Sequence, residues 1–149
     1  MSLSPGVLLK ERYKITSLIA SSGMGNIYLA EDQTLKTQVA VKENLYSSVD
    51  HSRQFRREAT LLANLRHPNL PRVIDHFVLP GMGEYLVMDY VPGQDLREKV
   101  TSLRKPMSEA EAVAIGVKIA QALSYLHTRT PPIIHRDVKP ANIKMTPEG

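Results

Sequence analysis

The chain has 149 residues, which is enough for one domain with a buried core. Hydrophobic residues make up 42% of it and charged residues 23%, the composition of an ordinary soluble globular protein. The formal net charge is only +4 and no dense basic block is present, so nucleic-acid binding is not expected. Because there is no cysteine, disulfides, thiolate zinc sites and cysteine nucleophiles are excluded.

Signals for membrane insertion or export are absent from the sequence. No apolar run approaches the roughly 18 residues that a membrane-spanning helix needs. Residues 1–6 lack the charged-then-apolar pattern of a signal peptide. A chain without cysteine is compatible with a reducing compartment. These features favour a cytoplasmic protein, while a membrane anchor beyond Gly149 stays open as an alternative.

The first half of the chain predicts a β-sheet with one helix set among the strands. The strand-like runs are rich in β-branched and aromatic residues; they are residues 13–19, 26–31, 38–42, 73–79 and 84–90. A small-residue loop at 20–25 joins the first two runs into a hairpin. The helix is predicted over 52–66, where Phe55, Ala59, Leu62 and Leu65 recur at helical spacing, and His67-Pro68-Asn69 ends it.

After a short hinge-like stretch at 91–94, the pattern becomes helical. Ser108 and Glu111 have the spacing of a capping box, which predicts a helix from there to about His127. Its apolar face comprises Val113, Val117, Ala120 and Leu123. Two short apolar runs, 133–134 and 143–145, then flank a polar loop.

That polar loop carries the strongest chemical signal, the run His135-Arg136-Asp137-Val138-Lys139-Pro140-Ala141-Asn142. Phosphoryl transfer needs a carboxylate that orients the attacking hydroxyl, a cation near the transferring group and an oxygen ligand for Mg²⁺. Asp137, Lys139 and Asn142 supply these three chemistries within one loop.

With this loop, the sequence resembles the eukaryotic-type serine/threonine protein kinases, particularly the bacterial members, from about Tyr13 to Gly149. The resemblance implies an α+β, protein-kinase-like fold: an antiparallel sheet with one main helix as N-lobe, followed by the start of a helical C-lobe. It implies that Asp137 is the catalytic base, that Lys139 contacts the γ-phosphate and that Asn142 binds the metal. Arg136 would meet a phosphorylated activation loop, which suggests regulation by autophosphorylation.

A second signal is Val39-Ala40-Val41-Lys42, a β-branched strand that ends in a lysine. In the kinase family this lysine lies beside the α- and β-phosphates and pairs with a glutamate on the next helix. Glu58 is at the matching position. The neighbouring Glu43 is expected to be solvated.

The glycine-rich loop of the family departs from its pattern here, because Ala20 and Ser22 replace its first two glycines and only the third is kept, as Gly25. Gly23 adds flexibility. Alanine restricts the backbone, so the hairpin is expected to be stiffer, and the Ser22 hydroxyl is a candidate donor to phosphate. Nucleotide affinity is the property that this departure puts in question.

The resemblance also implies a nucleotide slot. Its apolar walls would be Ile19, Ile27, Ala40 and Met88. The Asp89 carbonyl and the backbone of Val91 would meet the adenine edge. Asp95 matches a ribose-contacting acid, although it could equally be the N-cap of the next helix. Lys144 falls where the family often has an apolar residue beneath the adenine, and its stem could cover the base while its amine reaches water.

The sequence therefore predicts an N-terminal extension at 1–12, a kinase N-lobe at 13–91, and a hinge with the start of the C-lobe at 92–149. Residues 146–149 look like the turn before the Asp-Phe-Gly segment of the family, which is not in the chain. The helix that follows Ser108 would then lack its usual cover, so self-association through its apolar face is expected.

The favoured function is a protein kinase that transfers the ATP γ-phosphate to Ser or Thr hydroxyls, with Mg²⁺ or Mn²⁺ as cofactor and with ATP and a protein substrate as partners. This 149-residue stretch alone is expected to be inactive. Three alternatives stay open: a pseudokinase or nucleotide-binding module, a small-molecule phosphotransferase of the same fold, and a catalytically dead interaction piece.

Overall fold

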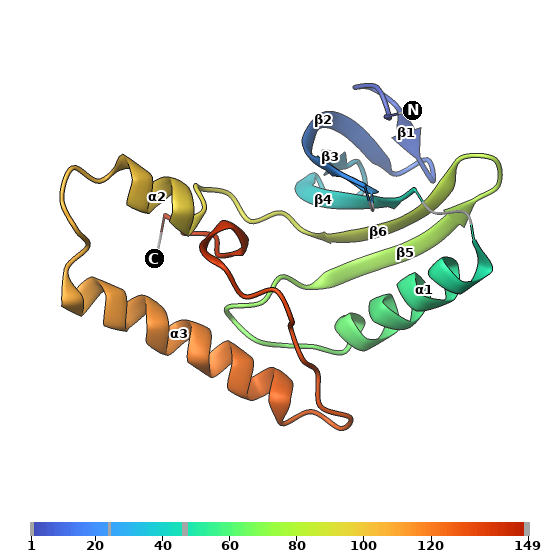
Figure 1. Ribbon diagram of the computed structural model, residues 1–149. Helices are drawn as coiled ribbons and strands as arrows, with labels where there is room; N and C mark the ends of the chain where they lie inside the picture. The colour runs from blue at the N-terminus through green and yellow to red at the C-terminus, as the bar shows by residue number, and fades with distance from the viewer. Residues whose placement is uncertain (1, 24, 46–47, 148–149) are drawn as a thin grey trace. The chain divides into compact units, whose positions relative to one another are not determined.

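The computed structural model describes residues 2–23, 25–45 and 48–147 (Figure 1). Met24 of the predicted glycine-rich loop, and Glu148 and Gly149 of the predicted turn, lie outside the described residues. The chain divides into two compact units. The first comprises Met1–Arg66 and Pro71–Tyr90, and the second comprises His67–Leu70 and Val91–Gly149.

The first unit is built on a six-stranded sheet in which each pair of neighbours is antiparallel, in the order β1-β2-β3-β4-β6-β5. The strands are β1 Leu8–Leu9, β2 Tyr13–Ser22, β3 Gly25–Asp32, β4 Thr37–Asn44, β5 Val73–Leu79 and β6 Gly83–Asp89. All five predicted strand runs are found. The hairpin between β2 and β3 is tighter than the predicted loop at 20–25, because Ser22 pairs with Gly25.

Two apolar layers cover the two faces of this sheet. Alternate residues of β4 and β6, such as Val41 and Val87, join a cluster with the tyrosines and β-branched residues of β2 and β3. On the opposite face, Phe55 and Ala59 pack against Leu86 of β6. These two buried residues belong to helix α1, Val49–Ala63, which lies along β5 and β6 in Figure 1.

Helix α1 begins three residues before the predicted start at residue 52. Ser48 is its N-cap and accepts a hydrogen bond from the backbone N–H of His51. The helix ends at Ala63, before the predicted proline stop, with Asn64 as its C-cap. The predicted apolar spacing holds for Phe55 and Ala59, and it determines which face of α1 meets the sheet.

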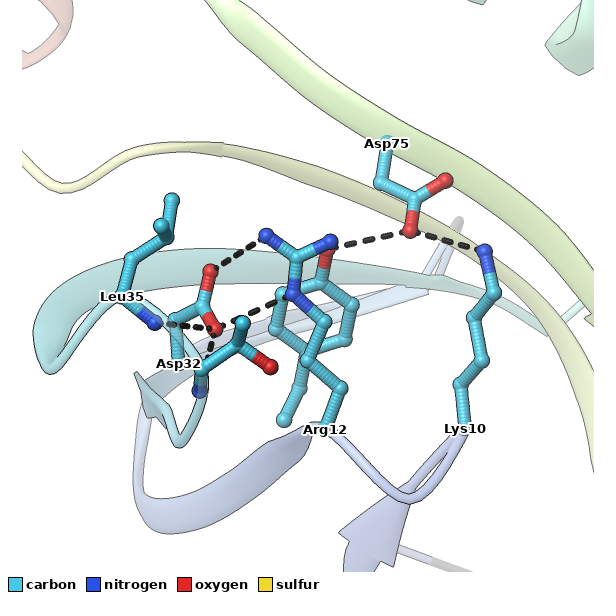
Figure 2. A network of polar contacts seen from close by, with 7 residues as sticks. Lys10, Arg12, Asp32, Leu35 and Asp75 are labelled. Carbon is cyan, nitrogen blue, oxygen red and sulfur yellow. Dashed lines mark hydrogen bonds and ion pairs between the residues drawn. The ribbon is translucent and has the colours of Figure 1, made fainter.

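The segment before Tyr13 takes part in the core of the first unit. Leu9 is fully buried, and β1 pairs with β2. Arg12 makes two hydrogen bonds to the fully buried carboxylate of Asp32, at 3.0 and 2.7 Å (Figure 2). Lys10 reaches Asp75 of β5 at 2.9 Å, so charged pairs join this segment both to the end of β3 and to β5.

The second unit contains helices α2 Leu96–Ser102 and α3 Glu109–His127 and a short 3₁₀ turn, η1 Pro140–Asn142. The predicted helix is found, and its N-cap Ser108 accepts from the N–H of Glu111 at 3.2 Å. The Glu111 carboxylate binds Lys99 at 2.6 Å, so the predicted capping box forms only its serine half. None of the described helices is both long and apolar enough to cross a bilayer.

Candidate functional site

Most of the side chains predicted to line a nucleotide slot share one face of the sheet. Directly opposed residues of an antiparallel pair point to the same face. Ile27 is opposite both Ala20 and Lys42, and Ala40 is opposite Met88. The strand pairing therefore places these residues side by side, on the face that α1 covers at Leu86 and Met88. Ile19 lies at the irregularity of β2 between Leu18 and Ala20 and is largely exposed.

The structure does not form the predicted pair between Lys42 and Glu58. Lys42 Nζ lies 5.9 Å from the centroid of the Phe55 ring, and Glu58 is exposed on α1. Neither side chain has an ion pair within the described part of the chain. Around the helix axis Glu58 lies about 60° from Phe55 and about 100° from Ala59, which places it at the edge of the packed face of α1.

The hairpin that replaces the glycine-rich loop lies close against β4. The Ser22 hydroxyl donates to the carbonyl of Gly25 at 3.1 Å, so it makes a contact within the hairpin. A Cβ atom on Gly25 would lie 2.0 Å from the carbonyl oxygen of Glu43, so no side chain fits there. Around Gly23, by contrast, an added Cβ would meet nothing within 4 Å.

Glu43 contradicts the expectation that it is solvated, because its side chain is buried. It follows Val39 and Val41 at a spacing of two, so it points to the same face of β4 as these core residues. The sequence contained this signal, since strand alternation already placed position 43 on the inner face. The sequence analysis missed the residue because charge normally indicates exposure.

In the second unit, the linker, here residues 91–96, pairs with the segment that follows the polar loop. The N–H of Leu96 donates to Ile143, and the N–H of Met145 donates to Gln94, at 2.8 and 2.9 Å. Gly93 has a φ of +102°, and a Cβ there would lie 2.2 Å from the Met145 carbonyl oxygen. The close approach and the positive φ together require glycine at this position.

This pairing brings together two predicted site residues, Asp95 and Lys144, across an isolated β-bridge. Asp95 Oδ1 accepts from the N–H of Glu98 at 2.7 Å, and Glu98 returns a bond to the N–H of Asp95, so Asp95 is the N-cap of α2. Lys144 Nζ lies 3.4 Å from the carbonyl of Gly93, so its amine meets the linker.

The two predicted adenine-edge residues, Asp89 and Val91, belong to different units. In the first unit, Asp89 holds Arg72: its carboxylate accepts from the Arg72 N–H at 2.9 Å and from Nε at 3.1 Å. Its own N–H donates to the Arg72 carbonyl at 2.9 Å. Val91 is half-buried in the second unit. Their contacts with adenine stay a prediction.

The polar loop brings its three predicted residues together. The Asn142 amide donates to the Asp137 carbonyl at 2.9 Å and to its carboxylate at 3.0 Å. Lys139 Nζ lies 3.5 Å from the other carboxylate oxygen. Asp137 and Lys139 are each more than half exposed, so both can reach a solute. The preceding Arg136 has a φ of +68°, an uncommon left-handed conformation for a residue with a side chain.

The donor set of this loop fits a hard divalent cation. The Asn142 amide nitrogen is engaged with Asp137, which leaves its carbonyl oxygen to act as a ligand, and Mg²⁺ prefers oxygen ligands. Within residues 2–23, 25–45 and 48–147, no three His, Asp or Glu side chains gather in a metal-binding group. The described residues therefore offer only part of a coordination shell, as expected where a cation also binds substrate phosphates.

A sheet with one packed helix, followed by a helical unit that carries this loop, defines a protein-kinase-like fold. A sequence model of the protein kinase domain matches residues 13–149. This match covers most of the chain, and the chain belongs to the protein kinase family.

Its similarity to individual kinases is moderate. The chain is 37% identical over 146 residues to serine/threonine-protein kinase PrkC of Bacillus subtilis, a match that covers 93% of this chain and 21% of PrkC. It is 36% identical over 147 residues to probable serine/threonine-protein kinase CPE1738 of Clostridium perfringens, covering 97% of this chain and 21% of that protein. The chain thus spans about a fifth of the length of these relatives.

A solved structure supports the same fold. The kinase domain of Mycobacterium tuberculosis PknI matches with a TM-score of 0.80 and 30% sequence identity. The match covers 97% of this chain and 58% of the PknI chain.

Proposed function

We propose that this chain is part of a protein kinase that transfers the γ-phosphate of ATP to Ser or Thr hydroxyls of proteins. The observation that carries the proposal is the contact of Asp137 with both Lys139 and Asn142 in one exposed loop. A carboxylate, a cation and an amide oxygen at this spacing meet the three demands of phosphoryl transfer. The names of the relatives support serine and threonine as acceptors.

In this proposal each loop residue has one task. Asp137 accepts a hydrogen bond from the attacking hydroxyl and takes its proton. Lys139 faces the negative charge of the transferring group, and its position 3.5 Å from Asp137 keeps the ammonium beside the acceptor. Asn142 offers its amide oxygen to Mg²⁺ or Mn²⁺, and the bound cation neutralises phosphate charge.

The nucleotide would lie against the sheet face that carries Ile27, Ala40, Lys42 and Met88. Lys42 supplies a cation for the α- and β-phosphates and has no carboxylate partner among the described residues that would compete for it. A separate part of the proposal concerns the second unit by itself, where the stem of Lys144 offers an apolar surface while its amine bonds Gly93. Asp95 caps α2 with one carboxylate oxygen, which leaves the other for a ribose hydroxyl.

A second candidate function is nucleotide binding without transfer. Two observations favour it: Ala20 and Ser22 replace glycines in the hairpin, and Glu58 does not pair with Lys42. Binding of Mg-ATP with no detectable phosphate transfer by the complete protein would support this candidate.

The test of the main proposal is Asp137→Asn in the complete protein. Asparagine keeps the shape of the side chain but cannot accept the proton, so autophosphorylation is expected to fall by about 10²–10⁴-fold. Glu109→Gln, which neutralises an exposed acid of the same unit, is the matched control and should keep full activity. Unchanged transfer by Asp137→Asn would refute the assigned role.

We propose that this kinase region lies in the cytoplasm, where ATP is available and where proteins rarely depend on disulfides. Self-association through α3 belongs to the same proposal. Val113 and Val117 are each about half exposed, at 56% and 49%, and they lie one turn apart on the same side of this helix.

A further inference from the structure

Glu43 is a buried carboxylate next to Lys42, the residue assigned to the nucleotide phosphates. The two side chains point to opposite faces of β4 because they are neighbours in a strand. Glu43 is only 4% exposed and lies beside Val41 in the core layer. A buried carboxylate costs several kcal/mol unless hydrogen-bond donors surround it. The donors around Glu43 therefore explain why it is tolerated.

Three neutral groups donate to this carboxylate. Asn26 Nδ2 and the Tyr28 hydroxyl reach Oε2 at 3.0 and 2.9 Å, and the Tyr85 hydroxyl reaches Oε1 at 3.5 Å. Glu43 forms no ion pair with any of the described basic residues. Burial, followed by the charge of Glu43, raises the pKa of Tyr85 to about 12, so this phenol stays a donor at neutral pH. The cluster is satisfied by hydrogen bonds alone.

Asn26 extends this cluster to the hairpin. Its side-chain oxygen accepts from the Ser21 hydroxyl at 2.7 Å, while its amide nitrogen donates to Glu43. Ser21 is on β2, Asn26 on β3 and Glu43 on β4, and Asn26 pairs with both in the strand register. A row of side-chain hydrogen bonds thus crosses three strands, one residue from Gly25, whose backbone lies flush against Glu43.

We infer that Glu43 is a positioning residue for nucleotide binding, which acts through Asn26 to hold the β2–β3 hairpin on β4. This inference rests on the proposed function, because it assigns the hairpin to the nucleotide phosphates. The hairpin has Ala20 and Ser22 where the kinase family has glycine, so its backbone is less free to adapt to a phosphate. The hydrogen bonds of Ser21 and Asn26 fix the hairpin on β4 before the nucleotide arrives. Less conformational entropy is then lost when ATP binds.

A purely structural role for Glu43 gives a different expectation. Glu43→Leu leaves the donors of Asn26, Tyr28 and Tyr85 without their acceptor, so some loss of stability is expected whichever role Glu43 has. If Glu43 serves stability alone, Glu43→Leu should lower the melting temperature while the folded protein binds ATP as tightly as the wild type. If it positions the hairpin, the same variant stays folded but binds ATP less tightly.

The experiment compares Glu43→Leu with Glu43→Gln in the complete protein. Glutamine keeps one oxygen for Asn26 and Tyr28, and its NH₂ can donate to the Tyr85 hydroxyl, so it should rescue the function. For Glu43→Leu we expect the KM for ATP to rise about tenfold while kcat changes less than about twofold, since uniform binding is lost. Melting temperatures report whether each variant is folded.

A readout that needs no catalysis is amide hydrogen exchange in β2 and β3. Exchange near Ser21 and Asn26 should be faster in Glu43→Leu than in Glu43→Gln, with unchanged protection in α1. Should Glu43→Leu fail to fold, Asn26→Asp is the second variant. It places two carboxylates about 3 Å apart, so protection should be lost mainly at the hairpin.

Wild-type exchange rates near Ser21 and Asn26 in a folded Glu43→Leu protein would overturn the inference. Equally fast exchange at these positions in the leucine and glutamine variants would overturn it as well. These outcomes do not depend on phosphate transfer. If Asp137→Asn kept full phosphate transfer, the proposed role of Asp137 would be wrong, yet Glu43→Leu could still exchange faster at the hairpin. Failure of the proposed function and failure of this inference are therefore distinguishable.

Discussion

The sheet unit and the polar loop of the helical unit hold their charged groups in opposite ways. In the sheet unit, Asp32 and Glu43 are buried, and each has several hydrogen-bond donors from different strands or loops. In the helical unit, the charged residues of the polar loop are exposed and mostly contact one another. Positions in the sheet unit are therefore set by tertiary packing, whereas the loop takes its arrangement mainly from a short stretch of sequence.

This difference predicts which substitutions change the free energy of unfolding. A charge that is removed from the sheet unit leaves an unpaired partner in or near the core, which is costly. A substitution in the exposed loop is expected to lower the proposed phosphate transfer while changing the free energy of unfolding little.

The largest loss of stability is expected for Asp32→Asn. The Asp32 carboxylate is fully buried and accepts two bonds from Arg12, so its neutralisation should lower the free energy of unfolding by about 2–3 kcal/mol. Urea unfolding measures the change. The exposed neighbour Glu31 provides the control, because Glu31→Gln should shift stability by less than about 0.5 kcal/mol. Equal effects of the two variants would contradict the contrast between the units.

Asp32 is also expected to make the free energy of unfolding fall at acid pH. The hydrogen bonds from Arg12, helped by the N–H groups of Leu35 and Thr34, lower the pKa of Asp32 in the folded state. Its stabilisation is therefore complete above the unfolded-state pKa, about 3.9, and is lost as the pH falls from there through the lowered folded-state pKa.

The measurement for this fall is the difference in unfolding free energy between the wild type and Asp32→Asn. We expect that difference to be constant above about pH 5 and to narrow below it. A difference that stays constant down to the lowest pH at which both proteins fold would show that Arg12 does not stabilise the charged form.

The smallest effect on stability is expected on α3, where Val113→Ser and Val117→Ser replace half-exposed side chains. Each should change the free energy of unfolding by less than about 0.5 kcal/mol. The pair of changes should, however, reduce self-association of this 149-residue chain in sedimentation experiments, with the exposed Ala114→Ser as control. If the double variant self-associates as much as the unmodified chain, α3 is not the surface of self-association.

Local pattern alone was enough for most of the fold. The five strand runs and the two long helices follow from alternation, helical spacing and the cap at Ser108. The three predicted residues of the polar loop, Asp137, Lys139 and Asn142, also contact one another as their close spacing in the sequence suggests. Short-range chemistry of this kind needs no knowledge of distant segments.

What the sequence analysis missed depends on distant contacts. Glu43 is buried because Tyr28 and Tyr85, from other strands, enclose it. The pair of Lys42 with Glu58 requires a particular rotation of α1 on the sheet, which no local pattern fixes. Strand alternation indicates which face of β4 Glu43 occupies but not which donors enclose it there, and the rotation of a helix on a sheet is a tertiary property as well.

The packing of residues 3–12 has a practical consequence for the choice of domain boundaries. The family match begins at Tyr13, so a shortened chain would naturally be started there. Such a chain would lack Leu9, which is fully buried, and Arg12, which meets the buried charge of Asp32. It would expose one edge of β2 and leave that charge without its partner. A recombinant domain should therefore keep these residues, and a purification tag should be joined ahead of Leu3, whose N–H already donates to Tyr28.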